Sequence, residues 1–423
     1  MFSVTARRLS ARMSTRPAVS APYTRAVVSA MRKLYPDALA DKSFDNTGLL
    51  LEAPFDPLRR QMNSVLLTID LTAAVADEAI ERNDSAIIAY HPIIFRGLKS
   101  LTLADTQQQT LLRLAAEGIS VYSPHTAVDC QVGGLGDWLA DIVTGTPIKA
   151  AVAAAAASSA APTPASEMPP AASPYKREQP LATPSSATSE YPFPEAGQRP
   201  VYMLQHHPSQ LSLNAQALTL ASRPHKRYPI IPTSVPGHEG AGMGRVVRLA
   251  QPVPLPAIID RIGLGLGNPK GFPIAIPQGR QAADMMIRTI AICAGSGAGV
   301  FAELDKRGET DIDLLFTGEL SHHDALAQIE RGRAVVCLFH SNTERGFLHG
   351  VLKPQLEETI KQEWKALRAE EREKHQKAAD ASNSNDDENA NDAFLEALAD
   401  ESVEVHVSEF DRDPFGIMIC KEN

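Results

Sequence analysis

Two segments of this 423-residue chain resemble each other, and this internal repeat constrains the fold more than any other feature of the sequence. Placing His91 on His340, a shift of 249 positions, also places Ile80-Glu81-Arg82 on Ile329-Glu330-Arg331. Both segments follow the same order of helix pattern, turn, apolar strand pattern, aromatic residue, histidine and Arg-Gly. A period this long is not that of a solenoid repeat. The repeat predicts a duplicated unit with a histidine at the equivalent strand end of each copy.

Strand and helix patterns alternate along both copies. In the first copy the apolar run SVLLTID is followed by the helix pattern AAVADEAIERN and by a second apolar run, AIIAY. Strands that alternate with helices of this length indicate crossover units and a mainly parallel sheet. The sequence therefore predicts an α/β protein made of two similar three-layer α/β/α domains. The runs VEVHVSEF and DRDPFGIMIC predict a closing pair of strands.

A segment rich in Ala, Pro and Ser separates the two copies. Residues 151–200 contain 14 Ala, 10 Pro and 7 Ser, and such a composition cannot offset its ordering entropy by burial. We therefore expect a disordered insert. The predicted organisation is a leader or disordered tail at 1–22, a first α/β half at 23–150, the insert at 151–236, and a second α/β half at 237–423. Within the second half, residues 364–402 are predicted to be a charged, partly disordered helical segment.

Charge and composition limit the compartment and the partners. The first twenty residues are rich in Arg and Ser and contain no acid, which is typical of a mitochondrial transit peptide, with a plain disordered tail as the alternative. Mitochondria are thus the predicted location, and the cytoplasm or nucleus is the alternative. No apolar run is long enough for a membrane span. A formal net charge of -9 argues against a nucleic-acid partner, and four scattered Cys argue against a disulfide scaffold.

Side chains that bind metals follow four of the predicted strands. They are Tyr90-His91, the pair His125 and Asp129, Glu319, and the pair His340 and Glu344. A spacing of four residues lets both members of a pair reach one site across a helical turn or a tight loop. A single histidine at a strand end is most often a hydrogen-bonded core residue. Equivalent histidines in a duplicated unit, each near a carboxylate, favour a site for Zn, Fe, Mn or Ni.

The glycine-rich stretch CAGSGAG, from Cys293 to Gly299, follows a predicted strand and precedes a helix pattern. A phosphate-binding loop would have that context, but Val300 stands where the third glycine of G-x-G-x-x-G would be. A tight turn between strand and helix is the predicted role, and an anion at the following helix N-terminus is the alternative.

The blocks that carry these residues resemble the signature blocks of the Nif-three-like proteins, also known as GTP cyclohydrolase I type 2 homologues or dinuclear metal centre proteins. The blocks are YHPIIFRGLKSL, SPHTAVDCQVGGLGDWL, TGELSHHDALAQIERG and FHSNTERGFL. The resemblance covers about residues 24–150 and 240–423. It implies two similar α/β domains that face each other, and a ring-shaped homo-oligomer, typically a hexamer.

The resemblance also implies metal sites between the halves, with His91, Asp129, His340 and Glu344 as ligands. Tyr90 stands where many members of the family have a second histidine. A neutral tyrosine hydroxyl is a poor ligand for a dication. The resemblance therefore implies one or two metal ions per chain, with Tyr90 and His125 as auxiliary residues.

The residues and the resemblance together predict a metal-dependent hydrolase that acts on a nucleotide or a related small molecule. A dication would lower the pKa of a bound water toward ~7, and Glu344 or His125 would accept a proton. The alternative is a non-enzymatic regulatory or protein-interaction factor with a structural metal, which the insert and the charged segment favour. A closed sphere of four protein ligands would indicate that alternative, and an open position would indicate catalysis.

Overall fold

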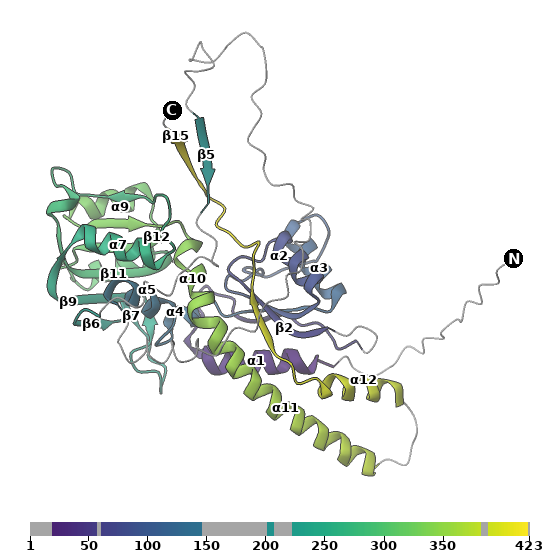
Figure 1. The fold of residues 1–423 in the computed structure, drawn as a ribbon. Coiled ribbons are helices and arrows are strands. Elements are labelled where there is room, and N and C mark those ends of the chain that lie inside the picture. Colours follow the sequence, from purple (N-terminus) through teal and green to yellow (C-terminus); the bar gives the residue numbers. More distant parts are fainter. Residues whose placement is uncertain (1–18, 57–60, 146–200, 207–221, 382–387, 422–423) are drawn as a thin grey trace, which may run out of the picture.

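The computed structural model of the chain describes residues 19–56, 61–145, 201–206, 222–381 and 388–421. The predicted leader and insert and the Asn/Asp/Ser tract of the charged segment lie largely outside these ranges. Within them, helices and strands form two main sheets in two lobes (Figure 1). The predicted α/β fold is therefore confirmed. No helix in the described ranges is both long and apolar enough to cross a membrane.

The first sheet has five strands in the order β1-β4-β3-β2-β14. The strands are β1 (Gly48–Leu51), β2 (Met62–Thr68), β3 (Asp84–Ala89), β4 (Ser120–Ser123) and β14 (Glu404–Val407). All neighbours are parallel except β1, which is antiparallel to β4. The predicted runs SVLLTID and AIIAY supply β2 and β3, which are almost entirely buried because helices cover both faces of the sheet.

The second sheet has six strands in the order β10-β13-β12-β11-β9-β6. The strands are β6 (His225–Tyr228), β9 (Arg245–Pro254), β10 (Ile274–Ala275), β11 (Met286–Ser296), β12 (Leu314–Glu319) and β13 (Ala334–Cys337). The central strands β11, β12 and β13 are parallel, whereas β9, β6 and β10 pair antiparallel with their neighbours. Two short ribbons, β5 (Val201–Gln205) with β15 (Ile417–Lys421) and β7 (Ile231–Pro232) with β8 (Gly242–Met243), complete the strands.

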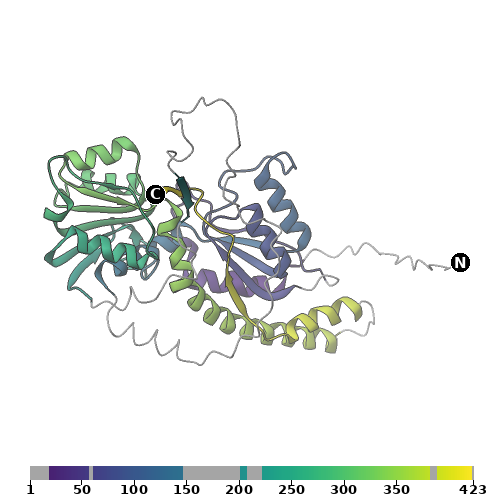
Figure 2. The same cartoon turned by 45° about the horizontal axis from the view of Figure 1, so that its top comes forward.

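Helices cover both faces of each sheet, and Figure 2 shows this layering. The outer layer of the first sheet is α2 (Ala73–Arg82) and α3 (Thr106–Glu117), and that of the second is α8 (Ala298–Lys306) and α9 (His322–Glu330). The inner layers contain α1 (Pro22–Leu34), α4 (Thr126–Cys130), α5 (Leu135–Thr144), α7 (Leu255–Gly265) and α11 (Lys353–Ala381). The short α10 (Arg345–Phe347) precedes α11, and α12 (Glu388–Ala399) follows it.

One hydrophobic core runs through both lobes, because the inner helices pack against both sheets. Helix α5, from the first half, packs on β9 and β11 of the second sheet. A buried ion pair supports this contact: the Arg245 guanidinium on β9 donates hydrogen bonds of 2.9 and 3.0 Å to the two carboxylate oxygens of Asp137 on α5. Arg227 on β6 also pairs with Asp137, at 3.2 Å. The two halves therefore share their interior.

The structure differs from the predicted organisation in the final strands. Both closing runs form strands, as predicted, but they do not pair with each other, because β14 pairs with β2 and β15 pairs with β5. Strand β14 buries Val405 and Val407 against the first sheet. It also covers an edge of β2 that would otherwise be open to pairing with another chain. Alternation shows that a run is a strand, but it does not show which distant strand is its neighbour.

The predicted boundary of the insert also differs from the structure. Residues within the predicted range 151–236 form β5, β6 and β7, and β6 is an edge strand of the second sheet. The β6 sequence HKRY is polar, so it carries no apolar alternation that would indicate a strand. Its ladder with β9 and the ion pairs of Arg227 hold it in place.

Candidate metal centre

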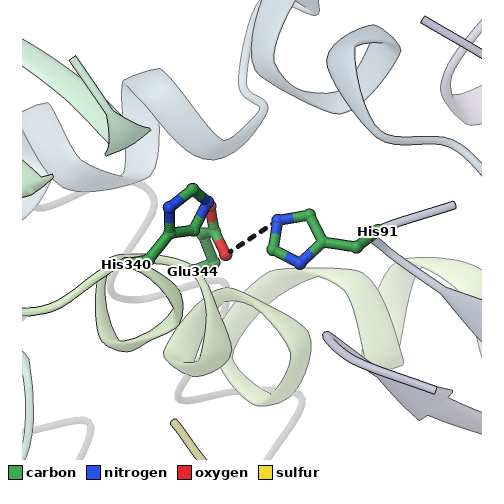
Figure 3. A group of neighbouring side chains, drawn as sticks. All are labelled: His91, His340 and Glu344. Atoms are coloured by element: carbon green, nitrogen blue, oxygen red, sulfur yellow. Dashed lines mark ion pairs between the residues drawn. The ribbon is translucent and has the colours of Figure 1, made fainter. Parts of the chain in front are cut away.

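The repeated histidines meet where the two lobes face each other. His91 follows β3 and His340 follows β13, and in both copies a helix, α2 or α9, precedes the strand. Polar side chains at the carboxyl ends of parallel strands are thus directed at one place. The centroids of the two imidazole rings are 5.2 Å apart. Figure 3 shows the rings on either side of the Glu344 carboxylate.

His91, His340 and Glu344 form a group with the geometry of a metal site. One donor atom from each lies within 4.8 Å of the others. The Nε2 atoms of His91 and His340 are each 3.5 Å from a different carboxylate oxygen of Glu344. Glu344 reaches the site because a short 3₁₀ turn, Ser341–Thr343, carries the chain from His340 to Glu344. These three predicted ligands are therefore brought together from both halves.

A second carboxylate holds each imidazole from behind. The Nδ1 atom of His91 is 2.9 Å from Oδ1 of Asp70, at the end of β2. The Nδ1 atom of His340 is 3.0 Å from Oε1 of Glu319, the last residue of β12. A hydrogen bond from Nδ1 to a carboxylate fixes the tautomer that leaves Nε2 free as a ligand, an arrangement common around protein-bound metals. The sequence indicated Glu319 as a polar residue at a strand end but did not indicate Asp70.

The Glu344 carboxylate is buried, yet one of its oxygens has no hydrogen-bond partner among the residues that the structure describes. The residue is 2% exposed, and Oε2 is an unsatisfied buried acceptor. Buried polar atoms almost always have partners, so an exception calls for a physical cause. A cation between this oxygen and the two Nε2 atoms would satisfy Oε2, which is why the residues present fit a metal ion.

The protonation of His91 reflects the same negative surroundings. Burial lowers the pKa of His91, but the carboxylates of Glu344 and Asp70 outweigh it and raise the pKa to about 11. The raised pKa favours the protonated imidazole, whereas only neutral imidazole coordinates a metal, so metal binding at this group would release a proton.

Gly295, in the glycine-rich stretch CAGSGAG, lies directly against the ligands. It has a φ of +57°, and a Cβ added there would be 2.7 Å from both Glu344 Oε1 and His340 Nε2. Its backbone N–H donates to the Thr343 hydroxyl at 2.9 Å. The stretch does join β11 to α8, as predicted, but the sequence did not reveal that Gly295 allows the backbone to approach the site so closely.

Tyr90, His125 and Asp129 lie beside the group but are not part of it. The Tyr90 hydroxyl donates a hydrogen bond of 2.7 Å to Asp129 Oδ1. Burial raises the pKa of Asp129 to about 6, and burial together with the charges of Asp129 and Glu344 raises the pKa of Tyr90. Asp129 was predicted as a ligand on the family resemblance, but in the structure it is the hydrogen-bond acceptor of Tyr90 rather than one of the three grouped donors.

His125 is a third imidazole held by a carboxylate. Its Nδ1 atom is 2.7 Å from Asp45 Oδ1, and its ring centroid is 5.4 Å from that of His91. The backbone of His125 has a φ of +33°, a left-handed value that non-glycine residues rarely adopt. Strain of this kind persists only where the surroundings impose it and is common at functional sites. Asp45 lies in the FDNTG loop, and only the folded chain brings it to His125.

Residues 408–414, which we call the strap, tie the two halves together behind the ligands. Asp411 accepts a hydrogen bond of 2.8 Å from the backbone N–H of Ile69 in the first half. The same carboxylate pairs with the buried guanidinium of Arg345 in the second half, at 3.0 Å. Asp413 accepts hydrogen bonds from the backbone N–H and the hydroxyl of Ser341, at 3.0 and 2.8 Å. Arg345 and Ser341 adjoin the ligands Glu344 and His340 in sequence.

The fold and the three-ligand group define a two-domain α/β protein with a candidate metal centre between its halves. A family model described as Duf34/NIF3 (NGG1p interacting factor 3) matches residues 22–374. The chain therefore belongs to the Duf34/NIF3 family, as its resemblance to the Nif-three-like proteins predicted. The matched range contains the three grouped residues but ends before β14 and the strap.

Relatives and solved structures agree with this family. The chain is 38% identical over 336 residues to the protein NIF3 homolog of Schizosaccharomyces pombe. The matched region covers 79% of this chain and 88% of that protein. It is 32% identical over 337 residues to the NGG1-interacting factor 3 of Saccharomyces cerevisiae, covering 78% of this chain and 90% of that protein. A Bacillus cereus protein related to NIF3 has a similar fold, with a TM-score of 0.52 at 17% identity, over 95% of this chain and 99% of that one.

Proposed function

We propose that His91, His340 and Glu344 bind a divalent metal ion and that the chain is a metal-dependent hydrolase. The observation that carries this proposal is the buried Oε2 atom of Glu344, which has no hydrogen-bond partner in the described part of the chain and lies 3.5 Å from Nε2 of His91. An unsatisfied buried carboxylate oxygen is costly, and a cation would remove the cost. Two imidazoles and one carboxylate suit Zn, Fe, Mn or Ni.

The number of ligands favours catalysis over a purely structural role. Structural zinc sites are closed by four protein ligands, whereas catalytic sites have three and leave a position open. Three donors form the group within the described residues. A divalent cation bound there would lower the pKa of water toward ~7 and so supply a nucleophile at neutral pH.

The chain's own residues have separate roles in this proposal. Asp70 and Glu319 orient the imidazoles of His91 and His340. Glu344 serves as a ligand, which leaves His125 as the candidate proton acceptor. Asp45 binds Nδ1 of His125, so that Nε2 is the nitrogen left to take up a proton.

Elemental analysis of purified protein tests the metal site. After loading with zinc and removal of excess metal, the wild-type chain should retain zinc, and His340→Ala should lose most of it. His323→Ala is the matched control, because His323 is an exposed histidine on α9 outside the three-ligand group. Glu344→Gln keeps the size of the side chain and tests the site again if His340→Ala fails to fold. Equal metal in the wild type and both ligand variants would contradict the proposal.

Activity is tested separately with a panel of nucleotides and phosphoesters. Hydrolysis that disappears in His340→Ala but persists in His323→Ala is the expected result. A metal-loaded protein that hydrolyses none of the panel would contradict the hydrolase and favour the regulatory or protein-interaction role.

A further inference from the structure

A cleft of about 1110 Å³ opens beside the proposed metal centre. Asp70 and His91 line it, and so do the first residues of α2 and α3 and part of the strap. Its volume slightly exceeds the range of about 300–1,000 Å³ that is usual for small-molecule pockets. Because His91 belongs both to the cleft and to the three-ligand group, a molecule in the cleft would reach the metal centre.

The strap presents two side chains to this cleft from a fixed backbone. Asp411 and Asp413 are buried and hydrogen-bonded to the two halves of the protein. Phe410 and Arg412 are exposed, and both line the cleft. The buried aspartates thus hold the backbone, while Phe410 and Arg412 face a space that the described residues of the protein do not fill.

The fold leaves the Phe410 ring partly exposed and gives the Arg412 guanidinium no polar partner among the described residues. Phe410 leaves 42% of its surface exposed, although burying an aromatic ring is favourable. Arg412 forms no hydrogen bond or ion pair with any other described residue, in contrast to Arg345, which is buried against Asp411. An aromatic ring and a free guanidinium two residues apart in a cleft are complementary to a ligand that has both an apolar ring and an oxyanion.

The acidic residues of the cleft leave room for such an anion. Asp70 and Asp413 also line the cleft, but their carboxylates are hydrogen-bonded to His91 and Ser341, respectively. Glu409 is exposed and is the acid that would oppose an anion. The first turns of α2 and α3 contain no acidic residue. A divalent cation at the ligand group would add positive charge at one end of the cleft.

We propose that the cleft binds a small molecule made of a planar ring and a phosphate group. Phe410 packs against the ring, and the planar guanidinium of Arg412 pairs with phosphate oxygens, for which its fork of N–H donors is suited. This inference rests on the proposed hydrolase, since it names the class of substrate that reaches the metal centre. Phe410 and Arg412 lie beyond the residues that the family model matches.

Calorimetric titration of the full-length, zinc-loaded protein tests the inference, with phenyl phosphate as the probe. Arg412→Ala should weaken binding about tenfold, because it removes charge-assisted hydrogen bonds. The control is Arg96→Ala, because Arg96 is also exposed but does not line the cleft. The affinity of this variant for phenyl phosphate should stay within about twofold of wild type. Equal effects of the two substitutions, or none from Arg412→Ala, would overturn the proposal.

Two further variants and two further probes separate the parts of the ligand. Phe410→Ala should weaken phenyl phosphate but leave inorganic phosphate unchanged, and Glu409→Gln should strengthen both. Benzoate carries a ring and a carboxylate. If benzoate binds as tightly as phenyl phosphate, the phosphate assignment is wrong.

The same titrations distinguish failure of this inference from failure of the proposed function. Binding that depends on Arg412 in protein shown by elemental analysis to hold no metal would support the cleft and contradict the metal centre. Zinc-loaded protein that shows no Arg412-dependent binding would contradict the cleft and leave the metal centre standing.

Discussion

Gly295 determines how closely the backbone of the second half approaches the ligands of the proposed centre. Its α-carbon lies where any side chain would collide with His340 and Glu344, and its positive φ adds strain for an L-residue. The site therefore depends on the absence of a side chain as much as on the three donors.

Gly295→Ala should reduce zinc affinity at least tenfold while leaving the fold intact. The added methyl group would displace His340 Nε2 or Glu344 Oε1, each 2.7 Å from the position of the new Cβ. Gly299→Ala is the matched control, since a Cβ at Gly299 has no atom within 4 Å and the residue lies in α8. Zinc competition against a chromophoric chelator measures both variants. Equal affinities in the two would contradict this account of Gly295.

The sequence predicted the residues that the repeat marks but not those that support them. His91 and His340 follow apolar runs, so their place at strand ends could be predicted from local pattern, and Glu344 follows His340 at a spacing of four residues. Asp70 and Asp45 support His91 and His125 only because packing brings separate parts of the chain together. Local pattern carries no information on such distant pairing. Asp129 was expected among the ligands, and its hydrogen bond to Tyr90 depends on the tyrosine that precedes His91 in this chain.

At the scale of elements, the strap is the connection on which the geometry of the ligands depends. Asp411→Ala should lower the free energy of unfolding by about 3 kcal/mol, because it leaves the buried Arg345 guanidinium without its carboxylate. It also removes the acceptor of the Ile69 N–H. Urea unfolding measures the loss, with the exposed Glu409→Gln as a control that should change little. A stability equal to wild type in Asp411→Ala would show that the strap does not hold the halves together.

The stability that the contact of α5 with the second sheet provides should depend on pH. Burial raises the pKa of Asp137, but its hydrogen bonds with Arg245 outweigh this and hold the pKa below its usual value. A depressed pKa in the folded state means that the ionised carboxylate stabilises the protein at pH values above the unfolded pKa of ~3.9. That stability is lost as the pH falls through the lower, folded-state pKa.

Asp137→Asn should therefore destabilise the protein by about 3 kcal/mol at pH 7, and its difference from wild type should shrink as the pH falls below the unfolded pKa of ~3.9. Thermal unfolding across this range measures the effect. Asp311→Asn is the control, because the pair of Asp311 with Arg248 is exposed and worth little. A difference that stays constant with pH would exclude the Asp137 carboxylate as its source.

At the scale of the whole molecule, the segment after His91 exposes several large apolar side chains. Phe95, Leu98, Leu101 and Leu103 are 46%, 44%, 51% and 70% exposed. Clustered exposed apolar residues usually mark an interface. The alternation of strands and helices predicted both sheets and their layers. Which apolar side chains stay exposed follows from three-dimensional packing that the local pattern does not contain.

We expect the purified chain to self-associate, with a hexamer as the state implied by the family resemblance. Light scattering after size exclusion measures the mass. Replacing Leu101 and Leu103 together by Asp should lower it, because charges placed in an apolar interface are not solvated. Leu395→Asp, on α12, is the control and should leave the mass unchanged. A wild-type protein with the mass of one chain would exclude self-association.

The order in which the ribosome delivers these parts follows from the place of β14 and the strap in the sequence. Both are translated after all three grouped residues, yet β14 completes the sheet that begins the fold, and Asp411 connects that sheet to Arg345. A nascent chain that has emerged as far as α11 therefore holds an unpaired β2 edge and still lacks the Asp411 carboxylate that pairs with Arg345 in the finished fold. Since domains generally fold from the N-terminus as synthesis proceeds, the first half of this protein must wait for a late segment before its sheet is complete. A chain released before that segment is made would carry His91, His340 and Glu344 without the connection that holds the halves around them.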